Sequence, residues 1–138
     1  MTTSMSHPSL PPHSKKHEWQ KFIDGFGYAF SGLWYALRTQ RNMRVHILLA
    51  LLVIIAGILL HLSPLEFAIV FIAIMLVFAA EMFNTVFEIC VDLSTPEYHP
   101  LAKIAKDVAA GAVLINALLA IIIGLFVFGP HLWSLVFK

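Results

Sequence analysis

The sequence predicts an all-α membrane protein with three transmembrane helices and an N-terminal amphipathic helix on the membrane surface. First, only 12% of its residues are charged, whereas about 25% is usual for a soluble domain. Second, the mean hydropathy is +0.84. Third, three apolar runs are each long enough to cross the hydrocarbon layer. These observations favour lipid over water as the solvent of this chain.

The 138 residues have room for one membrane domain, which we place at residues 17–138. Residues 1–16 are rich in proline, histidine and serine and hold little that is apolar, so we expect them to form a disordered arm. The net charge of +1 gives no indication of a nucleic-acid-binding protein. The single cysteine, Cys90, excludes a disulfide within the chain.

The surface helix is predicted over about residues 19–38. Its apolar residues recur at spacings of three and four, which is typical of a helix that lies in the membrane interface. These apolar residues, several of which are aromatic anchors, are Trp19, Phe22, Ile23, Phe26, Phe30, Leu33, Trp34 and Leu37.

The three spans are predicted at about residues 45–62, 66–92 and 101–128. Ser63 is expected to cap the second helix, with Pro64 at its first position. Gly129 and Pro130 are expected to stop the third helix, because proline removes a backbone donor.

Basic residues predict the orientation of these spans. Six of the nine lysines and arginines precede the first span, and the first loop has none. The N-terminus and the second loop are therefore expected in the cytoplasm, and the C-terminus outside. The six residues are Lys15, Lys16, Lys21, Arg38, Arg41 and Arg44.

Four polar residues in the second span are spaced three, four and four apart, namely Glu81, Asn84, Glu88 and Asp92. They share one helix face. A charge at mid-membrane costs about 3 kcal/mol on insertion scales, so this face should point into a protein interior or a wet cleft. Carboxylates gathered there repel one another unless a cation joins them, and oxygen ligands of this kind suit Mg²⁺.

Lys103 and Lys106 are expected on the same cytoplasmic side, where ATP is available. Phosphoryl transfer needs cations to neutralise the phosphates and a base to accept the hydroxyl proton. Glu81 is the deepest carboxylate and the best candidate for this base. Its depth suits the hydroxyl of a membrane lipid better than a soluble substrate.

Other interpretations remain open from the residues alone. Glu81 and Glu88 could be structural, or they could line an ion or proton pathway without catalysis. Lys103 and Asp107 are four apart and could simply form a pair on one helix. Because three helices can hardly enclose all these polar groups, we also expect a homo-oligomer whose neighbouring chains share the site.

Two segments resemble the signature of the bacterial membrane-embedded diacylglycerol kinase and undecaprenol kinase family. They are the run from Glu81 to Asp92 and the run from Ala105 to Val113, and the resemblance covers about residues 22–128. It implies a homotrimeric kinase that uses ATP and Mg²⁺ to phosphorylate a membrane lipid alcohol. It also implies a multi-pass protein of the bacterial inner or plasma membrane.

The resemblance implies a role for each matching residue. Glu81 resembles the catalytic base and Glu88 a metal ligand. The nucleotide side is represented by Asn84, Asp92, Lys106 and Asp107, and the vicinity of the lipid substrate by Gly32.

One position departs from the family pattern. Gln40 stands where the family often has a glutamate that helps to bind metal, and its amide oxygen can ligate Mg²⁺ but brings no charge. Asn42, Arg44 and His46 resemble members outside the proteobacterial diacylglycerol kinases. They favour undecaprenol as the lipid, with diacylglycerol as the alternative.

Overall fold

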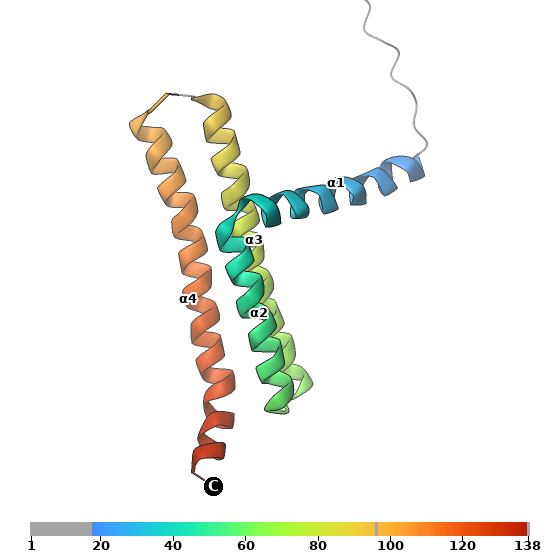
Figure 1. Cartoon of the computed structure of the whole chain (residues 1–138), viewed down its shortest axis with the longest axis vertical. Coiled ribbons are helices and arrows are strands. Elements are labelled where there is room, and N and C mark those ends of the chain that lie inside the picture. Colours follow the sequence, from blue (N-terminus) through green and yellow to red (C-terminus); the bar gives the residue numbers. More distant parts are fainter. Residues whose placement is uncertain (1–17, 96, 138) are drawn as a thin grey trace, which may run out of the picture. The chain divides into compact units, whose positions relative to one another are not determined.

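The structure is a computed structural model that describes residues 18–95 and 97–137, and the predicted arm at residues 1–16 lies outside them. Four helices follow one another along the chain: α1 (Glu18–Thr39), α2 (Arg41–Leu59), α3 (Pro64–Ser94) and α4 (Pro100–Val136) (Figure 1). The last three are long and apolar enough to cross a membrane. The predicted all-α class with three spans is therefore confirmed.

The chain divides into one unit up to Gly32 and a second from Leu33 onward, and each is described by itself. In the first unit, α1 carries a row of exposed aromatic side chains. The rings of Trp19, Phe22 and Phe26 pack edge to face, with centroids 6.3 and 5.1 Å apart. The location of α1 on a membrane surface stays a prediction.

A tight turn ends α2 at Leu59, before the predicted end near residue 62. His61 has a left-handed backbone with φ of 56°. The amide of His61 donates to the carbonyl of Ile58, and the amide of Leu62 donates to that of Gly57. These two bonds form a Schellman motif, in which a left-handed residue closes a helix. The motif turns the chain back so that α3 can pack against α2.

The start of α3 agrees with its prediction. The Ser63 side chain accepts a hydrogen bond from the amide of Glu66, and the Glu66 carboxylate accepts one from the amide of Ser63, which makes a capping box. Pro64 occupies the first turn, where its missing N–H costs nothing.

Packing between helices is centred on α3, which contacts α4 more extensively than it contacts α2. A small buried core of Leu62, Val70 and Val127 lies near the α2–α3 turn. Most other large apolar side chains are exposed within the single chain. A surface this apolar suits a lipid environment, where exposed side chains need no protein cover.

The predicted end of the third span was wrong. The helix α4 passes through Gly129 and Pro130 and continues to Val136. Backbone polar groups inside a membrane need hydrogen-bond partners within the protein. A proline is tolerated in a membrane helix where other groups satisfy the backbone groups that it frees. The next turns are also supported by side chains, since His131 Nδ1 lies 3.0 Å from the Val127 carbonyl and Ser134 donates to the His131 carbonyl.

Candidate functional site

The polar face of α3 is turned toward protein where it lies deepest. Glu81 is 1% exposed and Asn84 is 6% exposed. Farther along the helix Glu88 is half-buried and Asp92 is exposed. The expectation that this face avoids lipid is thus confirmed for Glu81 and Asn84. The burial therefore falls off along α3 from Glu81 to Asp92.

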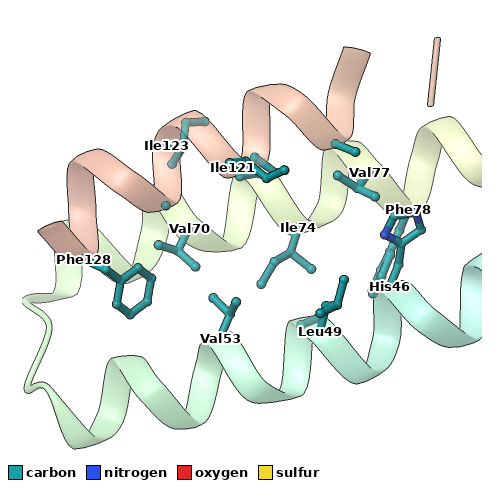
Figure 2. Close-up of a pocket in the computed structure, with 15 residues that line it drawn as sticks. His46, Leu49, Val53, Val70, Ile74, Val77, Phe78, Ile121, Ile123 and Phe128 are labelled. Atoms are coloured by element: carbon teal, nitrogen blue, oxygen red, sulfur yellow. The ribbon is translucent and has the colours of Figure 1, made fainter. Parts of the chain in front are cut away.

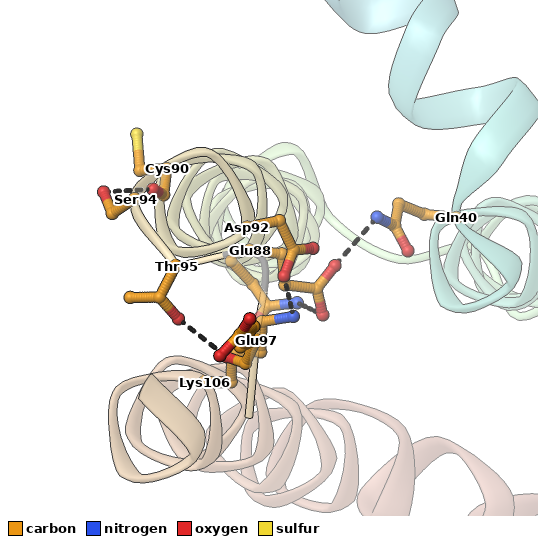
Figure 3. A network of polar contacts seen from close by, with 9 residues as sticks. Gln40, Glu88, Cys90, Asp92, Ser94, Thr95, Glu97 and Lys106 are labelled. Atoms are coloured by element: carbon orange, nitrogen blue, oxygen red, sulfur yellow. Dashed lines mark hydrogen bonds and ion pairs between the residues drawn. The ribbon is translucent and has the colours of Figure 1, made fainter. Parts of the chain in front are cut away.

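Glu88 accepts hydrogen bonds from two amides, and Figure 3 shows the one from Gln40. Gln40 Nε2 donates to Glu88 Oε2 over 3.0 Å, and Asn84 Nδ2 donates to Glu88 Oε1 over 3.2 Å. Gln40 is the residue just before α2, so its contact joins the beginning of α2 to α3. Gln40, Asn84 and Glu88 are therefore brought together as one cluster.

Asp92 contacts α4. Lys106 Nζ donates to Asp92 Oδ1 over 2.5 Å (Figure 3). Both side chains are partly exposed, and a cavity of about 470 Å³ opens beside them. Asp107 also lines this cavity, but it is paired with Lys103 over 2.6 Å, as the helix-pair interpretation predicted.

Glu81 meets a residue that the sequence analysis did not place in the site. His46 Nε2 on α2 lies 3.3 Å from Glu81 Oε1. The pair is close enough for a charge contact, but its geometry makes no hydrogen bond, and the buried Oε1 accepts none from the described residues. A histidine at the beginning of an otherwise apolar span was the signal that could have drawn attention to His46.

An apolar cavity of about 300 Å³ lies among α2, α3 and α4. Its walls are aliphatic and aromatic side chains with one polar exception, His46, which lies at one end of the labelled group in Figure 2. The cavity therefore adjoins the residue that contacts Glu81.

The donor set around Glu88 fits Mg²⁺ bound together with phosphates. Among residues 18–95 and 97–137, no three histidine, cysteine, aspartate or glutamate side chains form a metal cage. Mg²⁺ usually takes only one or two carboxylates, with water and substrate phosphates completing the shell. Asn84 Oδ1 is buried and accepts no hydrogen bond within the described part of the chain. An unsatisfied acceptor beside a carboxylate is a place that a cation stabilises.

Gly32 lies exposed on α1. Among the described residues, no atom beyond its immediate helix surroundings lies within 4 Å of the position that a Cβ would take there. Its assignment to the vicinity of the lipid substrate stays a prediction.

Comparison with known proteins shows the family of this chain. The family model described as prokaryotic diacylglycerol kinase matches residues 27–128. The chain belongs to the prokaryotic diacylglycerol kinase family. The matched range contains every residue of the site described above, from Gln40 to Asp107.

Three relatives show how far the similarity to this diacylglycerol kinase family reaches. The undecaprenol kinase of Bacillus subtilis is 46% identical over 86% of this chain and 98% of its own length. The diacylglycerol kinase of Synechocystis is 42% identical over 95% of this chain and 77% of its own. The diacylglycerol kinase of Helicobacter pylori (strain J99) is 32% identical over 97% of this chain and all of its own.

Proposed function

We propose that this protein transfers the γ-phosphate of ATP to the hydroxyl of a membrane lipid, with undecaprenol as the acceptor. Membership of the prokaryotic diacylglycerol kinase family supports the reaction class. The 46% identity to an undecaprenol kinase over nearly the whole of that protein supports the acceptor. Diacylglycerol is the second candidate, because other relatives carry that name.

One observation carries the proposal most directly: the polar face of α3 holds a buried carboxylate and a half-buried one, seven residues apart. Glu81 is almost fully enclosed, whereas Glu88 is more accessible and is held by two amides. Seven residues correspond to about 10 Å along a helix. Two long side chains at that spacing can serve a lipid hydroxyl at one end and a polyphosphate at the other.

In the proposed reaction the lipid hydroxyl oxygen attacks the γ-phosphorus. A new O–P bond forms while the bond from the γ-phosphorus to the bridging oxygen breaks, and ADP leaves. Glu81 accepts the proton released by the hydroxyl, which is general-base catalysis. The apolar cavity beside His46 supports a lipid acceptor, since a soluble alcohol would gain nothing from such walls.

Glu88, Asn84 and Gln40 would hold Mg²⁺, which when bound would neutralise the charge on the phosphates. Lys106 lies at the exposed end of the same region and would contact a phosphate after exchanging its present partner Asp92. Asp107 lines the cavity of about 470 Å³ beside Asp92 and Lys106, and it would lie near the nucleoside of ATP.

The assembly in which this occurs is part of the same proposal. We infer a homotrimer in a bacterial inner or plasma membrane with the N-terminus in the cytoplasm. The exposed apolar surface of the single chain supports both a lipid environment and contacts between copies. The distribution of basic residues supports the orientation.

The test is ATP-dependent phosphate transfer by the purified full chain in lipid bilayers. Undecaprenol and diacylglycerol are offered separately, with and without Mg²⁺, and the phosphorylated lipids are counted. We expect faster transfer to undecaprenol and a requirement for Mg²⁺. A higher rate with diacylglycerol would change the acceptor, and no transfer to either lipid by an intact oligomer would overturn the kinase assignment. Ion flux through the same vesicles without ATP would favour the pathway interpretation.

A further inference from the structure

His46 and Glu81 form a pair between two helices at the inner end of the site. Nε2 of His46 on α2 lies 3.3 Å from Oε1 of Glu81 on α3, and the side chains are 19% and 1% exposed. The pairing connects positions 35 residues apart in the chain, so it depends on the packing of α2 against α3.

The surroundings give His46 one polar partner. Its other neighbours in the cavity are aliphatic or aromatic, among them Leu49 and Phe78 (Figure 2). Within the described part of the chain, the carboxylate of Glu81 is the only polar group that His46 contacts. A histidine ring is commonly oriented by a backbone carbonyl or a carboxylate. For His46 the group at that distance is the carboxylate of Glu81.

The carboxylate needs this partner for an energetic reason. A buried acceptor without a hydrogen bond costs about 1–3 kcal/mol, and more when it is charged. Glu81 Oε1 is such an acceptor among the described residues. At 3.3 Å a small rotation of the imidazole is enough to turn the contact into an N–H···O hydrogen bond. Glu81 would then have one oxygen held and the other left for a substrate.

We propose that His46 is a positioning residue for Glu81, and the proposal rests on the proposed function. His46 donates its Nε2 proton to Oε1 of Glu81, which directs the other carboxylate oxygen at the lipid hydroxyl. The hydroxyl proton passes to that second oxygen, the hydroxyl oxygen bonds to the γ-phosphorus, and ADP departs. His46 keeps its own proton and takes no part in the bonds that form and break. A base oriented by a third group is a recurring arrangement in enzymes.

The experiment uses three substitutions at position 46 in the full chain. His46→Leu and His46→Phe both remove the N–H donor but differ in side-chain shape, so the test can be made if either variant folds. His46→Gln keeps an N–H donor on a side chain of similar reach. His61→Leu is the matched control, because His61 is an exposed histidine just beyond the other end of α2. Turnover, KM for ATP and the melting temperature with and without the nucleotide are measured in bilayers or mixed micelles.

We expect His46→Leu and His46→Phe to lower kcat about 10- to 100-fold, the range of a misplaced catalytic group. KM for ATP should stay within about threefold, because the nucleotide side is untouched. His46→Gln should recover most of the rate, and His61→Leu should behave like the unchanged protein. The proposal is overturned if both apolar variants keep normal turnover, or if His46→Gln loses as much as they do.

Combining each change with Glu81→Gln separates this inference from the proposed function. If His46 acts through Glu81, His46→Leu should leave the residual rate of Glu81→Gln unchanged within about twofold. If His46→Leu lowers the rate of Glu81→Gln by the same factor as it lowers the rate of the unchanged protein, His46 acts independently of Glu81, and the proposal is overturned. Near-normal turnover of Glu81→Gln alone would overturn the base assignment in the proposed function, and with it the role of His46.

Discussion

Gln40 Nε2 donates a hydrogen bond to Glu88 Oε2 over 3.0 Å, which ties the residue before α2 to the middle of the polar face of α3. The contact explains how the neutral amide of Gln40 can lie beside the carboxylate of Glu88. It satisfies one oxygen of Glu88, while Asn84 satisfies the other. Both amides can also turn their oxygens toward a cation.

Gln40→Glu should raise the affinity of the site for Mg²⁺. A second carboxylate beside Glu88 adds attraction for a divalent cation, and we expect about tenfold less Mg²⁺ at half-maximal effect, which is about 1.4 kcal/mol. The measurement is a Mg²⁺ titration of turnover and of melting temperature with a non-hydrolysable ATP analogue. Gln20→Glu, which adds the same charge at an exposed position of α1, is the control. Equal Mg²⁺ requirements for the two variants would refute a role for position 40 near the metal.

Glu88→Gln should weaken binding of the metal and nucleotide together. The loss of the carboxylate removes the one charged ligand that the cluster of Gln40, Asn84 and Glu88 offers, and we expect at least about a tenfold rise in the apparent Kd for Mg²⁺ and ATP. Calorimetric or fluorescence titration of the purified oligomer measures it. Unchanged binding would move the metal site away from Glu88.

Lys106→Met should raise KM for ATP about tenfold or more with little loss of stability. The pair with Asp92 is 37% and 65% exposed, and exposed pairs contribute only about 0–1 kcal/mol. Lys103→Met, which removes a neighbouring lysine, is the control. Steady-state kinetics and thermal melts should separate Lys106→Met from Lys103→Met. If the two variants shift KM equally, Lys106 has no specific phosphate contact.

His61→Gly should stabilise the fold by about 1 kcal/mol. His61 closes α2 in a left-handed conformation, which costs a residue with a Cβ about 1–2 kcal/mol and costs glycine nothing. His61→Ala keeps the Cβ and should bring no gain. Thermal melts in one detergent compare the variants, and a gain for alanine as large as that for glycine would show that the backbone conformation is not the cause.

Ser63→Ala should destabilise the protein by about 1 kcal/mol, the usual loss for a helix cap. It removes the side-chain oxygen that accepts the Glu66 amide at the start of α3. Ser94→Ala removes a hydroxyl that only bonds back to the Cys90 carbonyl within the same helix, so it should change the melting temperature little. Similar losses for the two variants would contradict the importance of the cap.

Much of the fold follows from local patterns. The three apolar runs predict the long helices, and Ser63 followed by Pro64 predicts the start of α3, because capping and ring geometry act over a few residues. The continuation of α4 through Pro130 could not be predicted in this way. A helix tolerates a proline where neighbouring helices or other groups satisfy the carbonyl that the proline frees. A local sequence rule contains no information about those neighbours.

The candidate site, too, is predictable from local patterns only in part. The spacing of Glu81, Asn84 and Glu88 within one helix places them on one face, and their burial follows from the cost of exposing charge to lipid. The contact of His46 with Glu81 depends on which face of α2 meets α3. The period of an almost wholly apolar helix does not determine that face, so the pairing becomes visible only in three dimensions.

The most direct test of the account is a single-turnover assay of Glu81→Gln with ATP, Mg²⁺ and undecaprenol, alongside a titration of ATP binding. Glu18→Gln, a change at an exposed position of α1, serves as the control. We expect Glu81→Gln to slow phosphate transfer about 10²- to 10⁴-fold, the usual contribution of a general base, while ATP binds nearly as tightly as before. Transfer at the rate of the control would contradict the claim that the buried carboxylate of α3 takes the lipid's proton.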